Sequence, residues 1–217
     1  MPASVQPLRY RLERRDIAPA TLLAVLMIVA FVMIGGEPLI LTFVPAVAAS
    51  WLIFLRMVSA ARPLPKAGHF LPLFYLTLVW QFVHFGEEFA MHFQTRFPEL
   101  YGAAPFPPTV FILFNTLSYL VLLLASLLVF ARHLHFFLVP ILLFIVYGAV
   151  GNAVAHTFWA VIHRGYFPGF FTAQAYWVLG PLVLTRLTGS RREALLSALG
   201  FAIFLLGILL LFTPLPT

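Results

Sequence analysis

Cysteine is absent from the 217-residue sequence, and charged residues make up only 9% of it. Without cysteine the chain has no disulfides, no thiolate metal site, no iron–sulfur cluster and no thiol nucleophile. Soluble domains carry roughly 25% charged residues, so the scarcity of charge excludes a soluble globular protein. The 13 basic residues occur in short clusters between apolar runs and form no single patch, which argues against a nucleic-acid partner.

Long apolar runs dominate the sequence. Hydrophobic residues make up 62% of the chain, and its mean hydropathy is +1.01. Runs of about 20 apolar residues, the length that crosses a bilayer as a helix, recur between proline, glycine and charged residues. We therefore predict an all-α fold, a polytopic transmembrane helix bundle with about seven spans. The expected spans cover residues 17–34, 38–58, 69–93, 109–130, 136–162, 171–187 and 193–212.

The distribution of basic residues predicts the orientation of the bundle. Lysine and arginine are enriched in cytoplasmic loops. If the N-terminus lies inside, eleven of the 13 basic residues fall in inner segments, and only Arg96 and Arg164 fall in outer ones. This bias predicts an inside N-terminus and an odd number of spans. Between the first two spans, Gly35, Gly36 and Glu37 leave room only for a tight hairpin turn.

The chain divides into a short inner segment, a membrane domain and one longer outer loop. We expect residues 1–16 to form a cytoplasmic N-terminal segment and residues 17–213 a single transmembrane helical domain. Residues 94–108 contain four prolines and three aromatic residues, which predicts a structured outer loop or flap. The other loops are short, so any activity sits in or against the bilayer. We expect an integral, multi-pass protein of a bacterial-type plasma membrane.

The third expected span carries polar residues near its outer end. Ionisable groups inside a span are costly, at roughly 2.5 to 3.5 kcal/mol each on insertion scales, and usually mark a functional site. At about 100° per residue, five polar side chains fall on one inward arc of this helix. They are Gln81, His84, Glu87, Glu88 and His92. A glutamate pair inside an apolar span is not a packing choice and therefore indicates function.

The fifth expected span carries a second polar group at a similar depth. Asn152 and His156 are four residues apart and share a helix face with His163. Gly148 and Gly151, one turn earlier, would let a neighbouring helix approach closely. Both spans run outward, and the rise counted from their inner ends places both groups in the outer half of the bilayer. We therefore predict that the two spans pack together and bring the two polar groups to one point.

Two motifs, His84-x-x-Glu87-Glu88 on one span and Asn152-x-x-x-His156 on a later one, resemble those of the HXXEE family of integral membrane proteins. The resemblance covers most of the chain, and the sequence keeps both motifs. It implies that these five residues form the functional centre of the protein. It implies no particular reaction.

The residue types favour a metal centre. Neutral imidazoles and carboxylates on facing helices are the ligands that zinc or non-haem iron uses where thiolates are absent. We expect His84, Glu88 and His156 to be the metal ligands. Two histidines and one glutamate would leave a position open for water or substrate. The leading hypothesis is a membrane-embedded, metal-dependent hydrolase or oxidoreductase that acts on a lipid or another hydrophobic substrate.

Four further residues are candidates for completing this centre. His92, one turn beyond the glutamate pair, or His163 would add a metal ligand. Glu87 or Asn152 would orient a ligand or act as the general base. Because the site lies toward the outer face, a hydrophobic substrate would enter sideways from the outer leaflet.

Two other functions fit the same residues. A glutamate desolvated in the bilayer can stay protonated, so Glu88 could protonate a double bond while Glu87 or His84 removes a proton, as a metal-free lipid or isoprenoid isomerase would require. Chains of intramembrane histidine and glutamate also mark proton paths, which suits a proton-coupled transporter. The lack of an internal repeat, and the clustering of the polar residues in one half of the bilayer, argue against transport.

Overall fold

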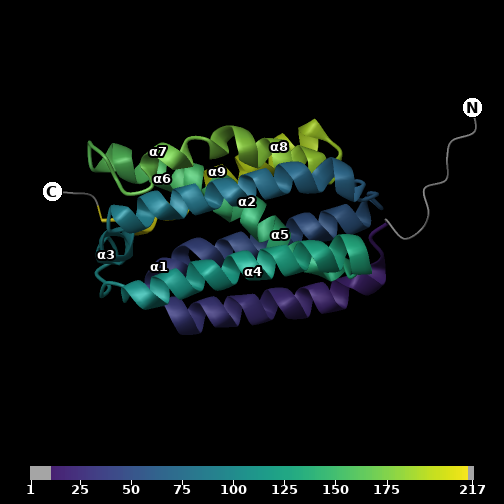
Figure 1. The fold of residues 1–217 in the computed structure, drawn as a ribbon, viewed down its shortest axis with the longest axis horizontal. Helices are drawn as coiled ribbons and strands as arrows, with labels where there is room; N and C mark the ends of the chain where they lie inside the picture. The colour runs from purple at the N-terminus through teal and green to yellow at the C-terminus, as the bar shows by residue number, and fades with distance from the viewer. Residues whose placement is uncertain (1–10, 215–217) are drawn as a thin grey trace, which may run out of the picture.

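The computed structural model describes residues 11–214, and this part of the chain is helical with no β-strand. The helices run along the length of an elongated bundle (Figure 1). The prediction of an all-α fold is therefore confirmed. The longer elements are α1 (Ile17–Ser59), α2 (Ala67–Ala90), α4 (Pro108–Arg132), α8 (Tyr176–Thr188) and α9 (Arg191–Phe212).

Helix α1 is a hairpin of two antiparallel arms, as the sequence predicts. Its backbone breaks at Gly36, where φ is 58° and ψ is −161°, a conformation that a residue with a side chain rarely adopts. The first arm covers residues 17–34 and the second arm residues 38–59. Across the hairpin, the Trp51 indole Nε1 donates a hydrogen bond of 3.0 Å to the Thr21 hydroxyl. Figure 1 shows the two arms in purple and dark blue.

The fifth expected span is the central helix of the bundle. It consists of a short 3-10 turn (His135–Phe137), α5 (Leu138–Leu143), a π-helical segment η4 (Phe144–Gly151) and α6 (Asn152–Ile162). Within the most apolar part of this helix, 83% of the residues are buried, against 11% for the first arm of α1. The π-helical segment was not expected from the sequence. Such segments are rare and occur frequently at functional sites.

Within the described residues, five helical segments are long and apolar enough to cross a membrane. Their outward faces carry exposed leucines, such as Leu22, Leu117 and Leu199, each with more than half of its surface accessible. A soluble protein rarely exposes so much contiguous apolar surface, so the bundle belongs in a bilayer. Helices α2 and α8, which correspond to the third and sixth expected spans, are not among the five. Helix α8 has 13 residues, about 20 Å at 1.5 Å per residue, so the seven-span count stays a prediction.

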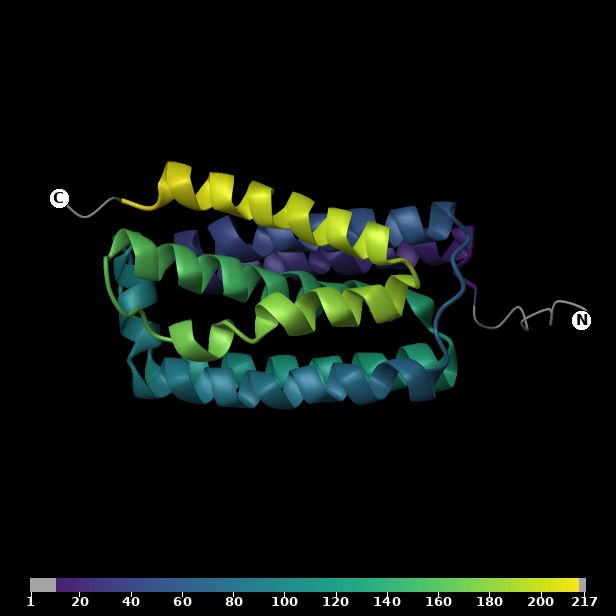
Figure 2. The same cartoon turned by 90° about the horizontal axis from the view of Figure 1, so that it is seen from above.

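The connections alternate between the two ends of the bundle. The start of α1 and the end of α9 lie at opposite ends (Figure 2). The end that holds the start of α1 also holds the connection from α8 to α9, where Gly189 is left-handed and the Ser190 hydroxyl caps α9 at the Glu193 amide. This end is tied together by an ion pair of 2.7 Å between Arg62 and Glu193. The side of the membrane that each end faces stays a prediction.

The expected outer loop, residues 94–108, contains a short helix. Helix α3 (Phe93–Glu99) begins directly after α2, and the chain then returns to the start of α4. The Phe106 amide donates a hydrogen bond of 2.8 Å to the Gln94 carbonyl, which closes the segment on itself. Phe97 is buried. In the predicted cytoplasmic segment, residues 1–16, the first ten residues lie outside the described part of the chain.

Candidate metal centre

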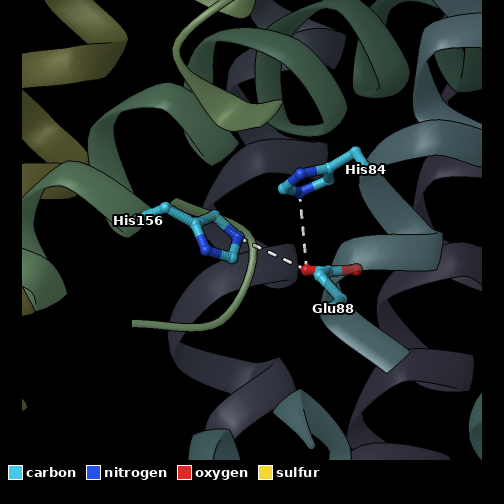
Figure 3. Close-up of side chains that lie close together, drawn as sticks. All are labelled: His84, Glu88 and His156. Carbon is cyan, nitrogen blue, oxygen red and sulfur yellow. Dashed lines mark ion pairs between the residues drawn. The ribbon is translucent and has the colours of Figure 1, made fainter. Parts of the chain in front are cut away.

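The structure brings His84, Glu88 and His156 together, as the sequence predicts. His84 and Glu88 lie one turn apart on α2, and His156 lies on α6. The carboxylate oxygen Oε1 of Glu88 is 3.5 Å from His84 Nε2 and 3.3 Å from His156 Nε2. One ligand atom from each residue lies within 4.8 Å of the other two. Figure 3 shows both imidazoles directed at the same carboxylate.

All three side chains are withdrawn from solvent. The exposed fraction is 0% for His84, 1% for His156 and 6% for Glu88. His84 Nε2 has no hydrogen-bond partner, although it is fully buried. A buried polar atom without a partner is uncommon in native structures and calls for a specific explanation, such as a role in binding an ion.

The hydrogen bonds on the other side of the two rings determine which nitrogen carries the proton. His156 Nδ1 lies 2.7 Å from the Pro168 carbonyl oxygen, which can only accept, so Nδ1 carries the proton. His84 Nδ1 lies 2.8 Å from the Thr172 hydroxyl oxygen. That hydroxyl donates its hydrogen to Glu87, so it accepts from His84. In the neutral imidazoles, both Nε2 atoms therefore present lone pairs to Glu88.

The segment that supplies these partners, residues 163–172, passes over the two histidines and is called the strap below. At Gly169 the strap has φ of +83°, and a Cβ there would lie 2.6 Å from His156 Cε1 and 2.9 Å from His84 Cε1. Glycine is thus required by the backbone angle and by the contact with both rings. Sequence reasoning did not identify Gly169 or Thr172. The adjacent Pro168 and Gly169 mark a turn, but not its proximity to the histidines.

Glu87 lies on the neighbouring face of α2 and holds the strap. Its carboxylate accepts hydrogen bonds from the Thr172 hydroxyl, from the Thr172 amide at 2.8 Å and from the Phe171 amide at 3.1 Å. It also accepts from the Tyr166 hydroxyl at 2.8 Å. Burial, together with this bond to Glu87, raises the pKa of Tyr166 to about 12. These contacts fit the expected orienting role of Glu87, because Thr172 in turn contacts His84.

Asn152 begins α6, and its side chain bonds within its own helix. Its side-chain amide donates a hydrogen bond of 3.1 Å to the Gly148 carbonyl within the π-helical segment. Asn152 also lines the cavity described below. A role for Asn152 in orienting a substrate stays a prediction.

The structure does not bring His92 or His163 into the group formed by the three buried residues. Helix α2 ends at Ala90, and His92 is left-handed with φ of 63° and exposed, so it no longer continues the helical arc. His163 follows α6 and stacks on Phe167, with ring centroids 5.7 Å apart. Burial and the nearby Arg96 lower the pKa of His163. A shared helix face therefore predicts which side chains lie together only as far as the helix continues.

A cavity of about 460 Å³ lies beside the three residues, and Glu88 contributes to its wall. Most of its lining is apolar, from α1, α4 and the central helix. Polar side chains also line it, among them Gln81, Tyr119 and Asn152. Gln81 is held in place by the Tyr176 hydroxyl, which donates a hydrogen bond of 2.6 Å to its Oε1.

Two of the distances within the group match those between ligands of a metal ion. Ligands placed about 2.0 to 2.1 Å from a tetrahedral zinc lie about 3.3 Å apart, close to the two distances from Glu88 Oε1 to the histidines. Two histidines and one carboxylate with open positions form the ligand set of many catalytic zinc and non-haem iron sites. The buried group could therefore hold a metal ion, and its carboxylate borders a cavity able to admit a second molecule.

The chain matches no family model, no curated protein and no solved structure.

Proposed function

We propose that the protein is an integral membrane metalloenzyme in which His84, Glu88 and His156 bind zinc or non-haem iron and act on a hydrophobic substrate. The observation that carries the proposal is the convergence of three buried acceptors. Two Nε2 lone pairs and one carboxylate oxygen meet within 4.8 Å, and the protons of both histidines are held on their opposite nitrogens. Acceptors that face one another repel unless a cation or a shared proton lies between them.

The strap supports this assignment. A histidine that ligates a metal almost always donates its other ring N–H to a carbonyl or a carboxylate-linked group, which orients the ring. His156 donates to the Pro168 carbonyl, and His84 donates to Thr172, whose hydroxyl in turn donates to Glu87. Both histidines of the proposed centre therefore have the arrangement that metal ligands typically show.

Each residue has a definite part in the proposed enzyme. Glu88 binds the metal and is the ligand that borders the cavity. Glu87 fixes the strap, and Gln81 and Asn152 present amide groups to a substrate in the cavity. A bound zinc or iron would supply Lewis-acid or redox chemistry at this wall.

Three wider expectations belong to the same proposal. The two motifs that meet here are those by which the chain resembles the HXXEE family, so we propose membership of that family. We also propose residence in a bacterial-type plasma membrane. The excess of basic residues in alternate loops supports an inside N-terminus, which places the centre toward the outer face.

Metal analysis of the detergent-purified protein tests the proposal. We expect about one zinc or iron per chain in the wild type, and loss of that metal in Glu88→Gln, because an amide is a much poorer ligand than a carboxylate. Glu99→Gln, which changes an exposed glutamate at the end of α3, is the matched control and should keep the metal.

The alternative of metal-free acid/base catalysis predicts a different result. A proton shared between Glu88 and a histidine would also satisfy two acceptors that lie 3.3 Å apart. If the wild type takes up neither zinc nor iron when offered, the metalloenzyme is refuted and the acid/base centre takes its place. Metal retained at wild-type affinity in Glu88→Gln would remove Glu88 from the ligands.

A further inference from the structure

We infer that the substrate of the proposed enzyme is a single-chain amphiphile with an uncharged, oxygen-containing head group, which enters from the bilayer between the first arm of α1 and α4. This inference rests on the proposed function and assigns its substrate class. Three features of the cavity carry it: its opening, its charge and its size.

The opening of the cavity faces lipid. Several residues that line the cavity are also exposed on the outside of the bundle: Ile34 at 60%, Val110 at 44%, Leu117 at 58% and Val121 at 52%. The first of these lies on the first arm of α1 and the other three on α4. Both helices are long and apolar enough to cross a membrane. The cavity therefore opens sideways, at a surface that the hydrocarbon of the bilayer covers.

The charge of the cavity wall selects the head group. Among the described residues that line the cavity, Glu88 is the one charged side chain, and neither lysine nor arginine is present. Protein sites for phosphate groups are built from Arg, Lys or rows of backbone amides. Here the polar part of the lining consists instead of amides and hydroxyls, such as Gln81, Asn115 and Ser118. These groups suit an alcohol, aldehyde, ester or amide, and the lining offers no cationic side chain for a phosphate.

The volume of the cavity limits the size of the apolar part. At about 30 Å³ for a water-sized group, 460 Å³ holds roughly 15 such groups. The enclosed part of the cavity therefore has room for about one acyl or isoprenoid chain, and the second chain of a phospholipid would have to stay outside it in the bilayer. The aromatic rings of Phe31, Phe43 and Phe114 enclose the apolar part, with centroids of Phe43 and Phe114 5.8 Å apart. The chain would lie among these rings, with its head group at Glu88.

Photolabelling in the membrane tests the inference. The probe is a long-chain primary alcohol with a diazirine in its chain, and it is compared with its phosphate ester and with a two-chain phosphatidylcholine that carries the same diazirine. We expect the alcohol to label buried residues of the lining, such as Leu39 of α1 and Leu122 of α4, and the other two probes to leave these residues unlabelled.

A substitution that fills the cavity should prevent this labelling. Ser118 lines the cavity, so Ser118→Phe should reduce the labelling by about tenfold or more. Leu120→Phe is the matched control, because Leu120 lies on the same helix, is 56% exposed and is not part of the lining. Ala30→Phe fills the cavity from α1 and serves as a second test should Ser118→Phe fail to fold.

The metal content of the same samples separates the two proposals. Ser118→Phe should keep the metal and lose the label, whereas His156→Gln, which changes a proposed ligand that is not part of the lining, should lose the metal and keep the label. Equal labelling of Ser118→Phe and Leu120→Phe, or labelling by the phosphate ester as strong as by the alcohol, would overturn the substrate class and leave the metal centre standing. A wild type that is labelled at the cavity but binds no metal would overturn the metalloenzyme and leave the cavity assignment standing.

Discussion

The substitution Gly169→Ala tests whether the strap positions the two histidines. The added Cβ would lie 2.6 Å from His156 Cε1 and 2.9 Å from His84 Cε1, whereas ordinary contacts begin at 3.4 Å. The His156 ring would therefore have to move by about 0.8 Å, unless the strap itself lifts. Metal sites hold their ligand distances to within about 0.2 Å, so a displacement of this size should impair binding. We expect metal affinity to fall by roughly 10- to 100-fold, the range seen when the partners of metal ligands are changed.

The control for this substitution is Gly102→Ala. Gly102 has φ of +66°, similar to Gly169 at +83°, but nothing lies within 4 Å of a Cβ added there. Both variants should lose roughly 1–2 kcal/mol of folding stability through the left-handed backbone, and only Gly169→Ala should lose metal. The assay is competition with a chelator on the purified proteins, together with thermal unfolding of each. Wild-type metal affinity in a folded Gly169→Ala protein would refute the reasoning.

Two further predictions concern the strap and the topology. Thr172→Val removes the hydroxyl between Glu87 and His84 at nearly constant shape, so metal affinity should fall by roughly 10- to 100-fold in the same chelator competition. Thr172→Ser keeps a hydroxyl and should restore the affinity. Equal affinities for the Val and Ser variants would exclude an orienting role for the hydroxyl. Reporter fusions at Glu99 and Ser190 should report opposite sides of the membrane, with Glu99 outside, and a shared side would contradict the seven-span topology.

The residues of the centre were predictable because helix periodicity is local. His84 and Glu88 are four residues apart, so any α-helix through them places both on one face. The sequence predicts that His156 joins the same site, because it lies at a similar depth and because burying an ionisable group in an apolar span costs free energy. The same rule failed at His92, because it assumes that the helix continues. The helix ends at Ala90, before the arc reaches that residue.

The strap could not be predicted in the same way. The distance between Gly169 and the two histidines depends on how the loop after α6 folds back over α2, and no periodic pattern encodes that path. The π-helical segment was also missed, because its residues read as a continuous apolar span that an ordinary α-helix would equally suit. The α1 hairpin, by contrast, is predictable because three residues separate two apolar runs and glycine allows the left-handed backbone that so tight a turn needs.

The two adjacent glutamates make different contacts because successive helical residues point about 100° apart. Glu88 faces the histidines, and Glu87 faces the strap, where it accepts hydrogen bonds from Tyr166, Phe171 and Thr172. The strap in turn fixes the proton of each histidine on the nitrogen remote from Glu88. A single carboxylate could provide a ligand or anchor the strap, but these two tasks lie on different faces of α2. An adjacent glutamate pair is therefore the shortest sequence that places one carboxylate at the centre and one at its support.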